Sequence, residues 1–404
     1  MLKIAVIGGG ASGITAAITA ARNSAEVTVY ERMDRIGKKI LATGNGRCNY
    51  TNKNCTVSRY HGQNPEFIIP ALKAFGVPDT VSFFDGLGML TRFEPDGKAY
   101  PYSYQASAVL DVLRFSLDDL NVKTVLNFEV SKILKTDNGF IIKSYDGREA
   151  YAQRVILASG GRASSFLGSN GSGYEIAKDL GHTITEVFPS LVQIKTDTAY
   201  VKALKGIKID ARVTFCAKDK IFESIGEVLF TEYGLSGPAI FDISRHCGEY
   251  KNAKLKLDLL YDMDYNRLVS LLRKRRCEKR NLENFFVGIL NKKLGMTIMK
   301  YANLLPYSRP SSELSDTEIF HLADCVKEFS LEILGTMSWN NAQVTAGGID
   351  CAEIDAATMQ SKLVKGLYIC GEVADIDGDC GGFNLQWAWS SGYVAGKSAV
   401  NYNG

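Results

Sequence analysis

The chain has 404 residues, of which 46% are hydrophobic and 23% are charged, and its formal net charge at pH 7 is +3. This length suits two or three domains with sizeable cores. So small a net charge does not by itself indicate a nucleic-acid or membrane partner. No run approaches the ~18 apolar residues of a membrane-spanning helix. The apolar N-terminal stretch contains three consecutive glycines, which disfavours a secretory signal.

The cysteine and histidine pattern bears on redox state and metals. Nine cysteines are scattered without any C-x-x-C pair. An odd number without such spacing indicates reduced thiols in a cytoplasmic protein, not a disulfide framework or a zinc site. The four histidines lie far apart, so we expect no metal.

The first thirty residues have the order strand, glycine turn, helix, strand. An apolar run over residues 4–7 is typical of a buried parallel strand, and it leads into a G-x-G-x-x-G turn. Gly8 permits the tight turn, Gly10 leaves room for a pyrophosphate, and Gly13 lets the helix pack closely on the strand. This context predicts a dinucleotide site.

The predicted helix, residues 11–23, would direct N–H groups near Ala11 and Ser12 toward that pyrophosphate. A second strand, residues 27–30, delivers Glu31 eighteen residues after Gly13. A carboxylate there can accept hydrogen bonds from an adenosine ribose. An ordinary βαβ unit with a glycine turn is the alternative, and this stretch does not identify the dinucleotide.

A second candidate loop is rich in glycine and amide side chains around one arginine. Gly and Asn are poor formers of helix and strand, so we expect a loop that lies against something flat and polar. Its backbone N–H groups and side chains would serve a phosphate or a flavin edge, and the alternative is a solvated turn cluster. The loop comprises Thr43, Gly44, Asn45, Gly46, Arg47, Cys48 and Asn49.

The next part of the chain is expected to be largely helical or irregular over residues 66–120, with a helix at 106–115. Residues 122–130 and 140–144 suggest a small antiparallel sheet laid on the main one. A buried strand at 155–158 ends in Ser159, Gly160 and Gly161. Glycines at a strand end let the backbone pass close to a ligand.

The character of the sequence changes after residue 190. Strands are expected within 191–260, interrupted by a Gly/Pro loop at 231–238, and helices rich in charge are expected over 262–335. We expect an insertion with its own β and α parts. Its dense basic run at 273–280 could contact RNA or DNA phosphates. A solvated helix face is the favoured interpretation.

The C-terminal section returns to buried strands that end in glycine, at 343–349 and 366–372. A helix starting near Asn384 would turn its N-terminal N–H groups toward flavin carbonyls. Four loops from both ends of the chain, 8–13, 43–49, 159–161 and 371–385, would then face the ligand. That number suits a long cofactor held along its length, so FAD fits better than NAD.

Together these motifs resemble one family. GGGASG, GKKILATGNGRCNYTN, the Leu-Ser-Gly-Pro loop, TAGGID and GEVADIDGDCGGFNLQWAWSSGYVAG are similar to the bacterial FAD-binding flavoproteins grouped with aminoacetone oxidase and the BaiN-type bile-acid reductase. The resemblance spans nearly the whole chain. It implies an α/β fold: a Rossmann-like FAD-binding domain of glutathione-reductase type, with an inserted β-barrel and a helical subdomain.

The resemblance also implies domain limits and cofactor contacts. The FAD-binding domain would comprise 1–190 and 340–404, the β-rich insert 191–260 (completed by about 328–339), and the helical insert 261–327. The glycine turn, Glu31 and Arg32 would hold the ADP half, Lys38 and Lys39 the phosphates, and Val130 the adenine. Thr43–Asn49 would border the ring and ribityl chain. The remaining contacts would be Gly371, Glu372 and Asp379 near the phosphate–ribityl region, and Gly381, Gly382, Phe383, Asn384 and Leu385 at the flavin ring.

The family's activities differ among members, so several functions stay open. The leading hypothesis is an FAD-dependent oxidoreductase acting on a small organic substrate where the Cys48 and Asn384 loops meet the insert. It would oxidise an amine with O₂ or reduce an activated C=C bond, with NAD(P)H as a transient reductant. No catalytic acid or base stands out. Arg47 would bind an anionic group or pair with an acidic loop.

Three further hypotheses concern other chemistry. A redox dithiol of Cys48 and Cys380 is disfavoured, and both are interpreted as packing residues. A flavin-containing RNA-binding or RNA-modifying protein would use the basic run, although the composition disfavours a nucleic-acid partner and gives no sign of a membrane partner. The third is a non-catalytic flavoprotein that senses redox state. The sequence leaves the oligomeric state open.

Overall fold

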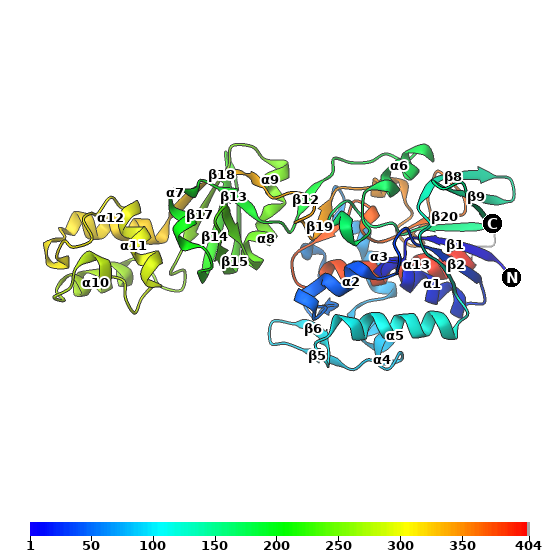
Figure 1. Ribbon diagram of the computed structural model, residues 1–404, viewed down its shortest axis with the longest axis horizontal. Coiled ribbons are helices and arrows are strands. Elements are labelled where there is room, and N and C mark those ends of the chain that lie inside the picture. Colours follow the sequence, from blue (N-terminus) through cyan, green and yellow to red (C-terminus); the bar gives the residue numbers. More distant parts are fainter. Residues whose placement is uncertain (402–404) are drawn as a thin grey trace. The chain divides into compact units, whose positions relative to one another are not determined.

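The chain divides into two compact units in the computed structural model, which describes residues 1–401 (Figure 1). Unit 1 comprises residues 1–189 together with the chain from residue 339 onward, and unit 2 comprises residues 190–338. Each unit has its own hydrophobic core.

A five-stranded parallel sheet forms the centre of unit 1, in the order β20-β11-β1-β2-β7. The first strand is buried along four of its five residues, as its apolar run predicts. The strands are β1 (Lys3–Ile7), β2 (Glu26–Tyr30), β7 (Lys123–Val125), β11 (Arg154–Leu157) and β20 (Leu367–Ile369). One expectation was wrong: residues 123–125 pair in parallel with β2 at the sheet edge and do not join the small antiparallel sheet.

Two helices from opposite ends of the chain pack against this sheet. They are α1 (Ala11–Arg22) and α13 (Phe383–Asn401). A Cβ at Gly392 would lie 2.4 Å from the Ser12 carbonyl oxygen, and one at Gly396 would lie 2.4 Å from that of Ala16. The two backbones can therefore approach closely only because these positions are glycine.

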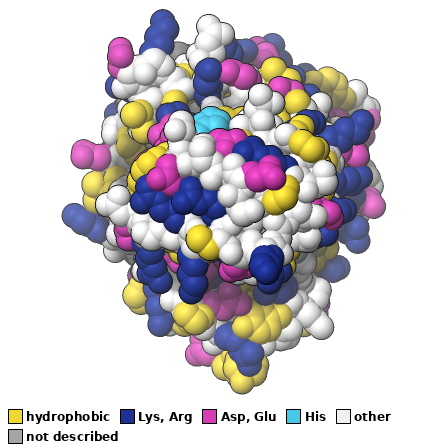
Figure 2. All heavy atoms as spheres, turned by 90° about the vertical axis from the view of Figure 1, so that its left-hand side faces the viewer, with side chains coloured by type: hydrophobic (Ala, Val, Ile, Leu, Met, Phe, Trp, Pro, Cys, Tyr) yellow, Lys and Arg dark blue, Asp and Glu magenta, His cyan; other side chains and the backbone are white. Residues whose placement is uncertain are grey.

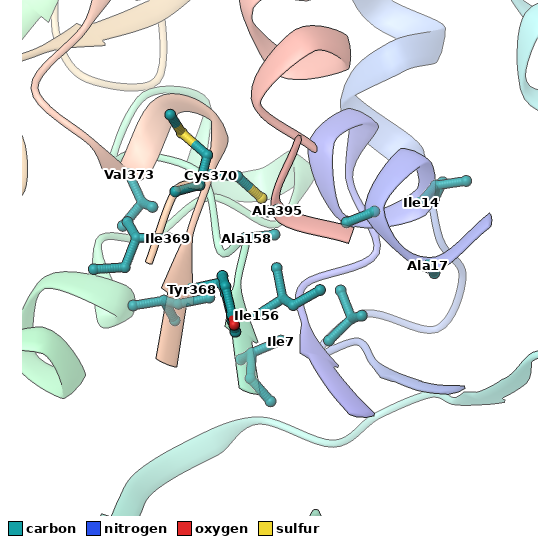
Figure 3. Packing of buried hydrophobic residues seen from close by; sticks show 14 of the residues in the cluster. Ile7, Ile14, Ala17, Ile156, Ala158, Tyr368, Ile369, Cys370, Val373 and Ala395 are labelled. Carbon is teal, nitrogen blue, oxygen red and sulfur yellow. The ribbon is translucent and has the colours of Figure 1, made fainter. Parts of the chain in front are cut away.

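A core of buried hydrophobic side chains lies between these elements. Figure 3 shows Ile7, Ile156 and Ile369 from three neighbouring strands in one cluster with Ile14 of α1 and Ala395 of α13. All five side chains are at least 96% buried. This packing fixes the carboxyl ends of the strands, where the glycine loops follow.

Smaller elements surround the sheet. The three-stranded antiparallel sheet is β8 (Val130–Thr136), β9 (Gly139–Ser144) and β10 (Glu149–Ala152). Short pairings join β3 (Thr51–Asn52), β5 (Thr91–Phe93) and β6 (Lys98–Pro101), then β4 (Tyr60–His61) with β21 (Asp377–Gly378), and β12 (Phe188–Ser190) with β19 (Val344–Ala346). Further helices are α2 (Lys38–Ala42), α3 (Ile69–Ala74), α4 (Val77–Asp85), α5 (Ala106–Asp119) and α6 (Ser172–Asp179).

Unit 2 contains a closed barrel with the strand order β13-β16-β15-β14-β17-β18. The strands are β13 (Ile194–Thr196), β14 (Lys208–Ala217), β15 (Lys220–Phe230), β16 (Gly234–Ser236), β17 (Lys254–Asp258) and β18 (Phe329–Thr336). The prediction of a loop over residues 231–238 is partly wrong, because Gly234–Ser236 is a barrel strand. The segment is short and glycine-containing, so only its pairing with β13 and β15 reveals it.

Helices complete unit 2. Three longer ones, α10 (Tyr265–Arg276), α11 (Lys292–Tyr301) and α12 (Asp316–Lys327), contribute Leu268, Ile298 and Leu322 to its core. Shorter ones are α7 (Thr198–Val201), α8 (Pro238–Ser244) and α9 (His246–Glu249). Among the described residues, no single helix meets the length and hydropathy of a membrane span. A bent pair, Pro65–Ala74 with Val77–Asp85, does so on those two properties alone.

Candidate functional site

The glycine turn between β1 and α1 leaves an open space in front of the helix. A Cβ at Gly10 would meet no atom of residues 1–401 within 4 Å. A Cβ at Gly13 would lie 1.9 Å from the Gly8 carbonyl oxygen, so this glycine serves the contact between helix and strand. No side chain in the described part of the chain caps the helix N-terminus. Its first N–H groups, at Ala11 and Ser12, are therefore available to an anion such as a pyrophosphate.

Glu31 is 92% buried at the end of β2 and organises the turn. Its Oε2 accepts from the Gly9 N–H (2.8 Å) and its Oε1 accepts from the Met33 N–H (2.8 Å). A carboxylate has about four lone-pair positions, so these bonds leave capacity for ribose hydroxyls. The sequence did not reveal that Glu31 also holds the glycine turn in place.

The other residues expected at the ADP end lie around the same edge of the sheet. The Arg32 side chain contacts Glu129 (3.2 Å) and the Gly168 carbonyl oxygen (3.2 Å). Val130 is buried at the start of β8. Ser159 follows β11, and its buried hydroxyl has no hydrogen-bond partner within residues 1–401.

A lysine–glutamate pair lies where the N-terminal and C-terminal loops meet. Lys39 Nζ is 2.8 Å from Glu372 Oε2, and Glu372 Oε1 accepts from the Thr345 N–H (2.9 Å). A Cβ at Gly161 would lie 2.8 Å from the same carboxylate, and one at Gly371 would lie 2.3 Å from Ser12 Oγ. Four predicted segments therefore converge here. Lys38 instead points to Asp34, 2.5 Å away.

The two loops expected at the flavin ring are in direct contact. The Asn52 side chain donates to the Gly381 carbonyl oxygen (2.8 Å), and the Trp389 indole donates to that of Tyr50 (2.8 Å). Gly382 has φ +98°, and a Cβ there would lie 2.7 Å from the Thr51 carbonyl oxygen. These contacts join segments more than 320 residues apart and place Gly381–Leu385 beside the Thr43–Asn49 loop.

Gln386 holds this junction together from the inside, a role that its sequence motif does not indicate. The side chain is fully buried. Its oxygen accepts from the Thr51 hydroxyl (2.5 Å), and its amide donates to Thr80 (2.8 Å) and Ser390 (2.9 Å).

Asn49 carries an unpaired polar atom in the same place. It is 92% buried, and its Oδ1 has no partner among the described residues, although a Cβ on Gly382 would come within 2.8 Å of it. A buried carbonyl oxygen without a donor costs about 1–3 kcal/mol. A flavin ring carries an N–H group, so this oxygen, the open space at Gly10 and the free N–H groups of α1 fit bound FAD.

Arg47 and Cys48 have different surroundings within the loop. The Arg47 guanidinium lies 4.9 Å from the centre of the Tyr100 ring and 3.8 Å from Glu94, so pairing with an acidic residue is observed. Cys48 is completely buried with φ +57°. Burial raises the pKa of its thiol to about 12, against the effect of a hydrogen bond with Thr43. A thiol with that pKa is not a thiolate at neutral pH, which disfavours the dithiol hypothesis.

Asp379 lies beside groups that the sequence did not single out. Its Oδ1 is 2.6 Å from His61 Nε2, and its Oδ2 is 3.3 Å from Arg59. Both partners belong to the stretch around β4, whose two residues are too few to give a periodic signal. Among residues 1–401 there is no group of three or more His, Cys, Asp or Glu that could hold a metal ion.

The chain matches known proteins over nearly its whole length. The profile of the HI0933-like protein Rossmann domain matches residues 2–398. The chain is 41% identical, over 99% of both chains, to the 3-dehydro-bile acid delta(4,6)-reductase of Clostridium scindens. It is 30% identical, over 97% of both, to the ribosomal RNA dihydrouridine synthase of Haemophilus influenzae.

A solved structure supports the fold. The 3-ketosteroid delta1-dehydrogenase of Sterolibacterium denitrificans aligns with 99% of this chain and 100% of its own, with a TM-score of 0.54 and 12% identity. Fold and site together define an FAD-binding flavoprotein oxidoreductase of the Rossmann type. More particularly, the chain belongs to the HI0933-like family. The predicted family and the predicted Rossmann domain with an inserted barrel are therefore confirmed.

Proposed function

We propose that this protein is a reductase of carbon–carbon double bonds that are conjugated to a carbonyl group. The names of two relatives share that chemistry. The double bonds of a 4,6-unsaturated 3-dehydro bile acid are conjugated to its 3-oxo group. Dihydrouridine is uridine with two hydrogens added across the double bond next to a ring carbonyl. Higher identity to the bile-acid reductase favours an alicyclic enone as substrate.

The observation that carries the proposal is the contact between the two loops expected at the flavin ring, Thr43–Asn49 and Gly381–Leu385. When bound, FAD supplies hydride transfer. The N–H groups at the start of α13 would stabilise negative charge on the flavin carbonyls. The Gln386 network would keep this helix end beside the Asn49 loop, and the Lys39–Glu372 pair would position the cofactor's central part.

The test is an anaerobic two-step experiment on the holoenzyme. NADH or NADPH should bleach the flavin absorbance, and a 3-oxo-4,6-diene bile acid added afterwards should restore it. Failure of both nicotinamides to bleach the flavin would contradict the assigned reductant. Rapid O₂-dependent oxidation of aminoacetone, without any reaction with the enone, would favour the amine-oxidase alternative.

A second candidate substrate is a uracil ring within RNA, and the charge of unit 2 favours it. Residues 261–327 contain twelve Lys or Arg and eight Asp or Glu, a net charge of +4 against +3 for the whole chain. The face shown in Figure 2 displays groups of Lys and Arg with fewer acidic side chains between them. Binding to RNA phosphates is dominated by such charge.

The basic run on α10 borders a shallow hollow of about 680 Å³. Arg273 and Arg276 pair with Asp316, and Arg275 pairs with Glu278. Within the described residues, Lys274 and Lys279 form no ion pair. The hollow is lined by Leu271, Lys274, Arg275, Glu278, Lys279 and Arg280.

RNA binding can be measured by titrating a transcribed ribosomal RNA fragment at several salt concentrations. The double variant Lys274→Glu/Lys279→Glu should bind more weakly and show a flatter salt dependence. Lys218→Glu/Lys220→Glu, which changes two exposed lysines by the barrel, is the matched control. Absence of binding at low salt would remove this candidate and leave the enone proposal unchanged.

A further inference from the structure

A histidine–aspartate pair lies at the rim of the junction between the ring loops. His61 and Asp379 contact each other at 2.6 Å, and their side chains are 26% and 15% exposed. The strand pairing of β4 with β21 holds His61 next to Asp377, and the Asp379 N–H donates to the Arg59 carbonyl oxygen (2.9 Å). Asp379 therefore lies on backbone that leads directly into the Gly381–Gly382 loop, and His61 is held beside that backbone.

The pair fixes which imidazole nitrogen can exchange a proton. The Asp379 carboxylate, which also contacts Arg59, presents acceptor oxygens to the imidazole, so Nε2 of His61 must carry hydrogen. Nδ1 makes no hydrogen bond within residues 1–401. It is therefore the nitrogen that gains and loses the proton, and the side chain is partly open to solvent.

Other candidate donors around the junction are less suited. Cys48 is completely buried, and the Tyr60 hydroxyl is buried and donates to the Phe383 carbonyl oxygen (3.0 Å). Arginine does not release a proton in proteins, which excludes Arg47 and Arg59. Cys380, next to Asp379, is half-buried and is the rival to test.

We propose that His61 is the catalytic acid that protonates the substrate, an inference that rests on the proposed reduction of a conjugated double bond. Saturation of the double bond adds a hydride to one carbon and a proton to the neighbouring carbon. The hydride would come from FAD that NAD(P)H has reduced. As hydride adds, the π electron pair shifts to the neighbouring carbon and forms a bond to the Nδ1 proton. The N–H electrons stay on the neutral imidazole, which Asp379 holds through Nε2–H, and solvent then reprotonates Nδ1.

The test separates the two half-reactions of the holoenzyme. In His61→Gln, bleaching of the flavin by NAD(P)H should keep its wild-type rate. Reoxidation by the 3-oxo-4,6-diene bile acid should slow about 10²–10⁴-fold, the usual contribution of general acid catalysis. Imidazole should restore part of the rate to His61→Ala. Cys380→Ser tests the rival donor, and His321→Gln, which changes an exposed histidine of unit 2, is the control that should stay near wild type.

The possible negative results contradict different parts of the proposal. Loss of reoxidation in Cys380→Ser, with His61→Gln unaffected, would overturn the proposal. So would loss of bound FAD from both His61 variants, because His61 would then serve cofactor binding. If the wild type itself never reacts with the enone, the proposed function fails instead.

A readout independent of turnover is the nitrogen NMR spectrum of labelled histidine. His61→Gln identifies the His61 signals among the four histidines. The neutral wild-type ring should show hydrogen on Nε2, and Asp379→Asn should shift this tautomer balance. A wild-type ring with hydrogen on Nδ1 alone would contradict the proposed donor atom.

Discussion

At the residue scale, Gly10 and Asn49 distinguish what the fold requires from what the bound cofactor requires. Gly13 and Gly10 belong to the same motif, yet only Gly13 has a protein atom against its missing Cβ. Asn49, in the second loop, keeps a buried oxygen unpaired. Each difference predicts that a substitution will change FAD binding and apoprotein stability by unequal amounts.

For Gly10→Ala, we expect an apoprotein as stable as wild type, because the backbone there is extended and the new methyl group meets no atom of the described residues. FAD binding should weaken by about tenfold or more, since that space would hold the pyrophosphate. Thermal unfolding and a fluorescence titration of FAD measure the two effects. Gly13→Ala is the comparison and should destabilise the apoprotein itself. Unchanged FAD affinity in Gly10→Ala would contradict the assignment.

For Asn49→Leu, the apoprotein should be as stable as wild type or up to about 1–2 kcal/mol more stable, because an unpaired buried oxygen is removed. FAD affinity should fall by about tenfold as a hydrogen bond to the ring is lost. Urea unfolding measures the change in apoprotein stability, and FAD titration measures the change in affinity. Asn52→Leu, which breaks the bond to Gly381, should instead lower both quantities. A marked loss of apoprotein stability in Asn49→Leu would contradict this view.

At the element scale, hydrogen bonds that join distant segments hold the site together. Gln386 ties α13 to β3 and α4, and His182 ties the segment after α6 to residues 353 and 361. His182 belongs to no motif identified in the sequence, and the motif that contains Gln386 does not indicate which residues this side chain contacts. Their importance follows only from burial and from the partners that they would leave unpaired.

The variant Gln386→Leu should lower the free energy of unfolding by about 2–4 kcal/mol, because the hydroxyls of Thr51, Thr80 and Ser390 lose a buried partner. Urea unfolding followed by tryptophan fluorescence measures this loss. Gln63→Leu, at an exposed glutamine, should stay within about 0.5 kcal/mol of wild type. A similar small change for Gln386→Leu would show that the network relaxes.

Acidification should weaken unit 1 through His182. Burial lowers the pKa of this imidazole, although Glu353 opposes the effect. The unfolded chain therefore binds a proton more readily, and unfolding free energy should fall as the pH drops below about 6.5. His182→Gln should flatten that dependence between pH 6.5 and 5 when urea midpoints are compared. An equally steep slope in the variant would assign it to other groups.

At the scale of the whole molecule, two cores imply two units that respond separately to the cofactor. All three tryptophans, Trp339, Trp387 and Trp389, belong to unit 1. Tryptophan fluorescence therefore reports unit 1, whereas the far-ultraviolet circular dichroism reports both units. The expected FAD contacts also belong to unit 1.

FAD at about one hundred times its dissociation constant should stabilise unit 1 by about 2.7 kcal/mol. The fluorescence-detected midpoint should rise, while the part of the dichroism transition due to unit 2 should stay where it is. Calorimetry with and without FAD provides the same comparison. One transition that moves as a whole would show that the two units unfold together.

Local sequence determined a large part of this protein. The first βαβ unit and the glycine-ended strands follow from hydrophobic runs and from turns that only glycine permits, because these depend on residues close in the chain. The loops at 43–49 and 381–385 were predicted as cofactor loops for the same reason. Short pairings such as β16, β7 and β4 were not predicted, since two or three residues carry no periodicity.

Tertiary structure decided what the separate motifs do together. Only the fold shows that Gly382 touches the Asn49 loop, that Lys39 pairs with Glu372, and that Asp379 holds His61. Such contacts join residues more than 300 positions apart, and no local preference specifies them. The cofactor could therefore be inferred from the sequence, whereas the candidate proton donor became visible only once β4 was placed beside β21.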